Sequence, residues 1–293
     1  MIIPGRVRLS QILHYVGRPL ALLFAWDVVV TAVYQSGLYK IELPALPMSL
    51  LGTVVAIYLS FRNATAYARW WEARTLWGTL VNNSRSFARE IKILLPQDAV
   101  YLKRDLVLRH VAYVHSLRLH LRREAPWQEL DARLPDDELR HLRRVANVPN
   151  AILSRTAEMI AQEPSLDSMK LVALERTMTE FSNAQGGMER IKNTPLPRQY
   201  ANYPVFFTHL FCALLPLGLV EVLGWYTPLG STAVGFLFLA LLKIGDDMQS
   251  PFSNTENDVP LTTLTRSIEI DLLDGLAETH ALKPVQIENG VLW

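Results

Sequence analysis

The sequence has little of what several protein classes require. Its 293 residues include one cysteine, Cys212, which cannot form an internal disulfide and whose apolar neighbours predict inert packing. Only 19% of the residues are charged and the formal net charge is +1, so we expect no nucleic-acid partner, because that needs a concentrated basic surface. No small-residue cleavage site follows the arginines of residues 1–18, so we expect no cleavable signal peptide.

Recognisable catalytic motifs are also missing. The sequence contains no phosphate-cradling glycine loop, no HExxH pair and no nucleophile elbow. His110, His115 and His120 are five residues apart, which scatters them around a helix, whereas metal pairs on helices need spacings of three or four. Acidic residues at 246–247 and 256–258 flank a helix end and a turn, where solvated side chains are usual and a cation site is the lesser alternative. We therefore expect that the protein is not an enzyme and that it binds no cofactor and no metal.

Long uncharged segments are what the sequence does contain. The run Leu43 to Phe61 has 19 residues without a charge, close to the roughly 20 that a helix needs to cross about 30 Å of hydrocarbon. It ends in Arg62, Arg69 and Arg74, with Trp70 and Trp71 between the last two. Arginine and tryptophan both favour the headgroup layer, so this stretch predicts a spanning helix that leaves the membrane and continues into water.

Four such segments predict two antiparallel membrane hairpins. The segments are Pro19–Tyr39, Leu43–Phe61, Gln199–Val220 and Val222–Leu242. A connection at 40–44 joins the first two, and Glu221 with the turn at 224–228 separates the last two. Asp27 interrupts the first segment. Because charges in a membrane are costly, we expect Asp27 and Glu221 to be paired or interfacial, with ion binding as the alternative.

The distribution of positive charge predicts the orientation. Arginines and lysines flank the N-terminus, the end of the second segment and the start of the third, whereas the opposite side has only Lys40 in its two short loops. Cytoplasmic loops carry the excess of positive charge. Both termini and the region between the hairpins are therefore expected in the cytoplasm, at the inner membrane.

The remaining regions predict soluble helices, and the fold class is all-α. One helical stripe reads Leu102, Leu106, His110, Tyr113, Leu117 and Leu121. Four prolines, at 126, 135, 149 and 164, divide the middle region into four or five helices, and one more helix is expected near Leu261–Leu276. The expected parts are an N-terminal hairpin (1–71), a cytosolic helical domain (72–198), a second hairpin (199–250) and a cytosolic C-terminal segment (251–293).

The second predicted span carries two parallel columns. Thr53, Ile57 and Phe61 share one face at four-residue spacing, and a neighbouring column of small residues lies at 52, 56 and 60. Such a stripe faces lipid or packs on another helix by default. However, a helix that packs closely through small residues can present its adjacent column to an axis. Four spans cannot enclose a water path alone, so such an axis implies several subunits around a poorly wetted apolar neck.

Several motifs in order carry a family resemblance. They include Ser49–Gly52 through Phe61–Asn63, Ala68–Arg74, Leu76–Gly78, Gly186–Arg190, Thr194–Pro197, Pro251–Phe252 and Asn257–Asp258. With the two-plus-two spans, these motifs resemble a bacterial bestrophin homologue, from an ion-channel family of ring-shaped pentamers. The resemblance implies passive conduction of small inorganic ions across a lipid bilayer: chloride or other anions by family, with monovalent cations as the alternative. A membrane-anchored scaffold whose cytosolic helices bind a partner is the competing hypothesis.

The resemblance also implies site residues. The neck positions correspond to Thr53, Ile57 and Phe61, where Thr53 replaces a larger aliphatic residue and predicts a wider outer ring. A second constriction, the cytosolic aperture, corresponds to Leu166. At the calcium clasp of animal members this chain has only two acids among residues 254–258, too few for a carboxylate-rich shell. We expect no calcium gating, and a turn braced by its own Asn or Asp side chains.

Overall fold

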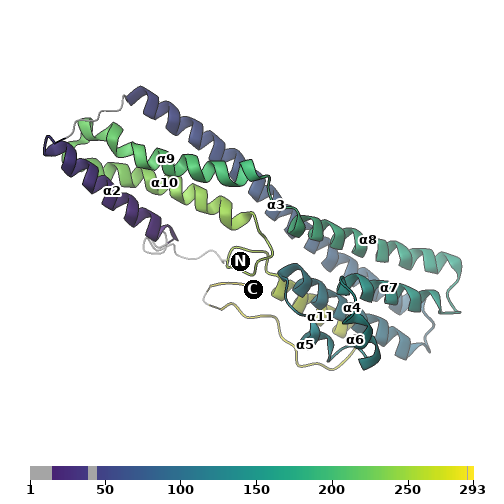
Figure 1. Ribbon diagram of the computed structural model, residues 1–293. Coiled ribbons are helices and arrows are strands. Elements are labelled where there is room, and N and C mark those ends of the chain that lie inside the picture. The colour runs from purple at the N-terminus through teal and green to yellow at the C-terminus, as the bar shows by residue number, and fades with distance from the viewer. Residues whose placement is uncertain (1–14, 39–44, 289) are drawn as a thin grey trace. The chain divides into compact units, whose positions relative to one another are not determined.

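The regular structure of the chain is helical. A computed structural model describes residues 15–38, 45–288 and 290–293 (Figure 1). Its elements are α2 (Gly17–Gln35), α3 (Ala45–Leu94), α4 (Val100–Arg122), α5 (Trp127–Leu130), α6 (Asp136–Leu142), α7 (Val148–Ala161), α8 (Ser168–Asn193), α9 (Arg198–Leu223), the 3-10 turn η1 (Gly224–Tyr226), α10 (Thr227–Met248) and α11 (Leu261–Gly275). Within the described ranges the only strand-like pairing is an isolated bridge between Glu288 and Val291. The all-α prediction is confirmed.

The chain divides into two compact units, and α3 contributes to both. Of the described residues, the first unit contains 15–70 and 195–250, and the second contains 71–194 and 251–293. The predicted connection at 40–44 and the N-terminal arginines Arg6 and Arg8 lie outside the described residues.

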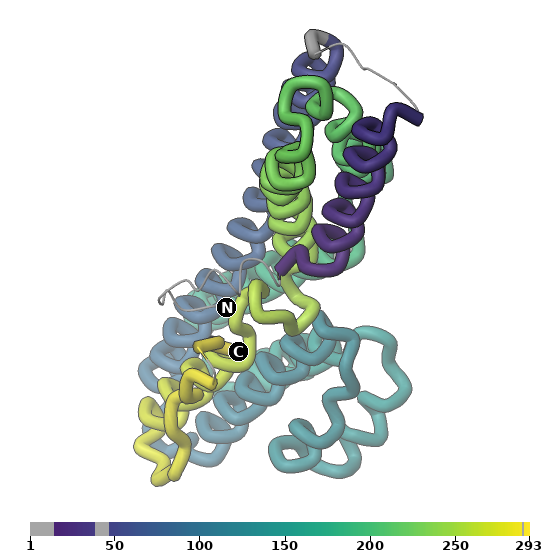
Figure 2. Tube along the Cα trace, turned by 90° about the vertical axis from the view of Figure 1, so that its left-hand side faces the viewer, coloured from purple at the N-terminus to yellow at the C-terminus, as the bar shows by residue number. Residues whose placement is uncertain are grey.

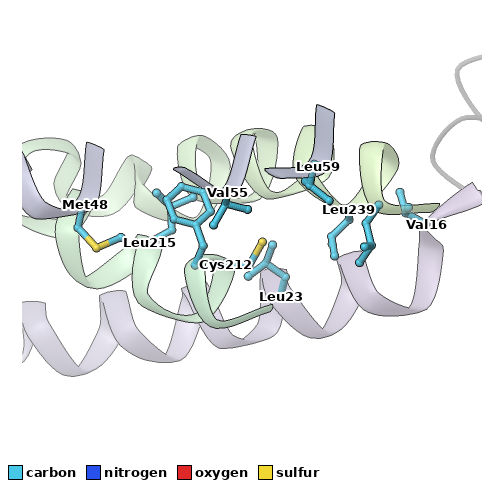
Figure 3. Packing of buried hydrophobic residues seen from close by; sticks show 10 residues of the cluster. Val16, Leu23, Met48, Val55, Leu59, Cys212, Leu215 and Leu239 are labelled. Carbon is cyan, nitrogen blue, oxygen red and sulfur yellow. The ribbon is translucent and has the colours of Figure 1, made fainter. Parts of the chain in front are cut away.

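The first unit packs α2, α9 and α10 with the N-terminal part of α3 around an apolar core. These helices run side by side in both views of the chain (Figures 1 and 2). Figure 3 shows the core side chains, which are Val16, Leu23, Met48, Val55, Leu59, Phe211, Cys212, Leu215, Leu239 and Leu242. Cys212 is buried and free, as the sequence predicts. Among the described residues, Gly17–Gln35 and Arg198–Met248 are long and apolar enough to cross a membrane.

The second unit packs α4 against α5, α7, α8, α11 and the C-terminal part of α3. The prolines divide this region as predicted: Pro126 and Pro135 precede the first residues of α5 and α6, Pro149 lies in the first turn of α7, and Pro164 separates α7 from α8. Side chains of Asn147 and Asp167 accept hydrogen bonds that cap α7 and α8. The expected stripe on α4 is an underestimate, because every residue from Val111 to Leu119 is buried.

Candidate functional site

The predicted stripe on α3 lies on an exposed face of the first unit. Ile57 is 52% exposed and Phe61 is 63% exposed. Thr53 is also exposed, and its hydroxyl donates to the Ser49 carbonyl at 2.8 Å, one helical turn back. All three side chains therefore lie on one face, and none of the described helices of their own unit covers them.

This exposed face is wider than the sequence predicted. Leu50 and Val54 belong to it, with exposures of 59% and 63%. Neither residue follows the four-residue column, but both fall within the same arc of an ideal helix at 100° per residue. Counting apolar residues over this whole face of the helix, rather than along one four-residue column, could have identified both residues.

The opposite face of α3 is packed against α9 and α10. Val55 and Leu59 are buried there. Gly52 allows a close approach to α9, because a Cβ atom at this position would lie 3.0 Å from two carbons of the Phe211 ring. Ser60, the third residue of the small column, is exposed. The column therefore packs closely at its first member only.

Beside the exposed stripe the unit has an apolar groove of about 430 Å³. Gly52, Thr53 and Ala56 line it from α3, and Phe211 and Phe238 line it from α9 and α10. The two rings contact each other with centroids 4.7 Å apart. The surface beside Thr53 is therefore concave and apolar.

Arg62 ends the apolar part of α3. Its side chain is only 1% exposed, a burial that the sequence did not predict. Its guanidinium pairs with Asp246 and donates to the Leu242 carbonyl at 3.0 Å. The C-terminal turns of α10 offer a carboxylate and carbonyl oxygens together, and the negative end of a helix attracts a cation.

Further donors from α3 bind the same end of α10. The Asn63 amide donates to the Leu241 carbonyl at 2.8 Å, and Arg69 Nε donates to the Gln249 carbonyl at 2.8 Å. Gly245 makes room for them, because a Cβ atom there would lie 2.3 Å from Asn63 Oδ1. We call these contacts of Arg62, Asn63 and Arg69 with α10 the α3–α10 latch. The role of Gly245 was not predicted, because the sequence around it shows only a glycine followed by two aspartates.

The buried acid of α2 is hydrogen-bonded to α10. Asp27 is fully buried and accepts hydrogen bonds from the Ser231 hydroxyl at 3.0 Å and the Thr232 hydroxyl at 2.8 Å. Both donors lie on α10, so the carboxylate ties α2 to that helix. Glu221, near the end of α9, is exposed.

In the second unit, Leu166 lies on the loop before α8, as the sequence predicts. It is partly exposed, and its amide donates to the Glu163 carbonyl at 3.2 Å. The next residue, Asp167, caps α8 by accepting from the Lys170 amide at 2.9 Å. The loop is therefore fixed at both sides of Leu166.

The three histidines of α4 have separate partners. His110 contacts the Ser84 hydroxyl at 2.8 Å, and burial lowers the pKa of its imidazole to about 3. His115 lies 3.3 Å from carboxylate oxygens of both Glu129 and Glu269. His120 lies 3.6 Å from Glu189. In the part of the chain that the structure describes, no group of three or more His, Cys, Asp or Glu residues could hold a metal ion.

The acidic turn after α10 is braced internally. Asp258 is 3% exposed and accepts hydrogen bonds from the Ser253 amide and the Thr255 hydroxyl. The Val259 amide donates back to the Pro251 carbonyl at 3.1 Å. Asn254 adopts a left-handed φ of 62°, which asparagine tolerates well. The predicted brace by a local acid is confirmed.

Comparison with known proteins identifies the class. Residues 5–274 match the family model described as bacterial/fungal bestrophin protein, and the chain belongs to the bestrophin family. It is 37% identical over 265 residues to a voltage-dependent anion channel-forming protein of Ralstonia nicotianae, covering 88% of this chain and 86% of that protein. It is 35% identical to YneE of Escherichia coli K12, a protein of the same description, over 78% of this chain and 75% of that one.

A solved structure agrees with this assignment. The crystal structure of a bacterial bestrophin homologue from Klebsiella pneumoniae matches with a TM-score of 0.85 and 30% identity, covering 89% of this chain and 98% of that one. The resemblance noted in the sequence is confirmed, and so is its all-helical architecture.

Proposed function

We propose that the chain is a subunit of a homopentameric channel that passes small inorganic ions passively across the inner membrane. Anions are the first choice, because relatives at 35–37% identity are named anion channel-forming proteins. Monovalent cations are the alternative, since apolar rings do not select a sign of charge by themselves. Family membership and the absence of a recognisable catalytic motif in the sequence both favour a channel over an enzyme.

One observation carries this proposal. Thr53, Ile57 and Phe61 are exposed on a helix whose other face is packed, and the uncovered face is mostly apolar. A ring of subunits would bring these faces together around an axis and form the neck, with Leu166 at a second, cytosolic aperture. The groove beside Thr53 would then receive a neighbouring copy of the chain.

The membrane arrangement belongs to the same proposal. Segments 1–71 and 199–250 would supply four spans, and segments 72–198 and 251–293 would lie in the cytoplasm with both termini. Support comes from the two apolar helical stretches, 17–35 and 198–248, and from the uncharged run that precedes Arg62 on α3. The lipid bilayer and identical subunits are the expected partners.

The test is a reversal-potential measurement on purified protein in liposomes with asymmetric salt. We expect a measurable current whose reversal potential gives the sign of the permeant ion. Ile57→Ala should increase the current, because it removes three carbons from the neck. Leu237→Ala is the matched control, since it removes three carbons from a side chain 59% exposed on α10, away from the stripe. Flux equal to that of empty liposomes in every salt would reject the channel and favour the scaffold hypothesis.

A further inference from the structure

A cavity of about 740 Å³ lies in the first unit, between the start of α2 and helices α9 and α10. Its lining has two kinds of surface. Ala21, Val205, Leu239 and Leu242 form an apolar wall, and Arg18 and Lys243 contribute basic side chains. None of these residues belongs to the stripe on α3 or to the predicted aperture.

The charges around this cavity leave Arg18 available. Lys243 pairs with Asp247 at 2.7 Å, and Asp246, which also lines the cavity, is engaged by the buried Arg62. Arg18 is exposed, and its guanidinium has no ion pair or hydrogen bond with any residue that the structure describes. The net charge of these five groups is therefore +1, because Lys243 and Arg62 are each paired with an aspartate and Arg18 is not.

Lys243 is oriented for a second interaction. Its ammonium is held by Asp247 and lies 5.6 Å from the centroid of the Tyr15 ring. An ammonium has three N–H donors, and the bond to Asp247 uses one of them. The side chain is 44% exposed, so the remaining donors can reach a bound anion.

Both basic residues lie at the ends of apolar segments. Arg18 directly precedes Pro19, where the first apolar segment begins, and Lys243 directly follows Leu242, the last residue of a 21-residue uncharged run. If these segments span the membrane as in the proposed function, on which this step rests, Arg18 and Lys243 lie at the headgroup layer. Ala21 lies about one turn after Arg18 on α2, and Leu239 lies about one turn before Lys243 on α10. This part of the apolar wall then lies at the depth of the acyl chains.

We propose that this cavity binds an anionic phospholipid. Arg18 and Lys243 hold the phosphate by charge-assisted hydrogen bonds, and an acyl chain lies against Ala21, Val205 and Leu239. A free phosphate would satisfy the basic residues but would leave the apolar wall uncovered. The wall therefore selects a lipid over a soluble phosphate.

The test counts bound lipids on the purified protein in neutral detergent, by native mass spectrometry, with phosphatidylglycerol or phosphatidylcholine added. The wild type should retain phosphatidylglycerol in preference. Arg18→Gln should weaken that retention by about tenfold, as loss of a charged hydrogen bond implies, and Arg18→Lys should restore most of it. Arg198→Gln is the control, because Arg198 is an exposed arginine at the start of α9 outside the cavity and its substitution removes the same charge.

Three results would overturn the proposal. The first is equal retention of the two lipids, and the second is an equal loss in Arg18→Gln and Arg198→Gln. The third is complete displacement of the lipid by millimolar inorganic phosphate, which would indicate a soluble-anion site instead. Ion flux of the same variants separates this site from the channel proposal: a variant that conducts normally but has lost its lipid preference supports both, and a protein that binds the lipid but never conducts rejects the channel alone.

Discussion

Arg62 of α3 and Asp246 of α10 form an ion pair whose arginine is 1% exposed and whose aspartate is 40% exposed. The pair determines which way α3 faces within the first unit. Phe61 precedes Arg62 by one residue, which is about 100° around a helix. When the guanidinium is held against α10, Phe61 therefore points to the side of that contact, and Ile57 and Thr53 lie farther round on the same exposed face. The latch and the exposed stripe are two consequences of one helix rotation.

Breaking this pair should destabilise the first unit. Asp246→Ala would leave the buried guanidinium without its carboxylate, and we expect a loss of about 2–3 kcal/mol, between the values for exposed and fully buried pairs. Asp271→Ala is the control, because its pair with Arg85 is exposed by 36% and 53% and should contribute less than about 1 kcal/mol. Thermal unfolding in one detergent compares the two. Equal shifts in Tm would contradict the latch.

Alanine substitutions at two adjacent glycines of α8 should change the stability of the protein in opposite directions. At Gly186 a Cβ atom would meet nothing within 4 Å, so Gly186→Ala should stabilise the helix by up to about 1 kcal/mol. At Gly187 a Cβ atom would lie 2.8 Å from Leu76 Cδ1 of α3, so Gly187→Ala must displace that side chain and should lose about 1–2 kcal/mol. Denaturant unfolding of both variants measures the difference, and an equal gain in both would show that Leu76 moves at no cost.

Local signals made most of the fold predictable. The prolines at 126, 135, 149 and 164 act on their own backbone neighbours, so the breaks between α4 and α8 follow from sequence directly. The length of an uncharged run likewise predicts a helix long enough to cross a membrane, and no knowledge of packing is needed for it. The face carrying Thr53, Ile57 and Phe61 was recognised by periodicity, since one helix fixes which side chains align.

The features that could not be predicted are contacts between residues that are far apart in the sequence. The buried ion pair of Arg62 was not predicted, because its carboxylate partner is 184 residues away and helical periodicity says nothing about α10. Gly245 has meaning only once Asn63 is known to lie against it. His110 was assigned to a stripe, but its burial among Phe87, Tyr113 and Phe181 required three helices to come together.

The buried His110 predicts a pH dependence for the second unit. Burial lowers its folded-state pKa to about 3, whereas an unfolded histidine titrates near 6.5. Below about pH 6.5 the unfolded chain takes up a proton that the folded chain does not, so stability falls as pH falls, by up to about 1.4 kcal/mol per pH unit. Above pH 6.5 this contribution is fully present.

The variant His110→Gln tests that assignment. Glutamine can still bond to the Ser84 hydroxyl but does not titrate, so the variant should be less stable at neutral pH and lose less stability between about pH 6.5 and pH 5. The measurement is denaturant unfolding at four pH values, with His141→Gln, which removes an exposed histidine of α6, as the control. Parallel pH profiles for wild type and His110→Gln would refute the contribution of His110.

The turn at 254–258 should act as a brace without sensing calcium. Asp258 is buried and its two oxygens already accept bonds from Ser253 and Thr255, so the carboxylate is committed to its own turn. Ion flux in liposomes should stay constant as free calcium is raised from nanomolar to millimolar. Asp258→Ala should cost about 1–3 kcal/mol, because the Ser253 amide and the Thr255 hydroxyl both lose their acceptor, while Glu256→Ala, which removes the exposed acid of the same turn, should be nearly neutral. Steep activation by micromolar calcium that Asp258→Ala abolishes would instead make this aspartate a metal ligand.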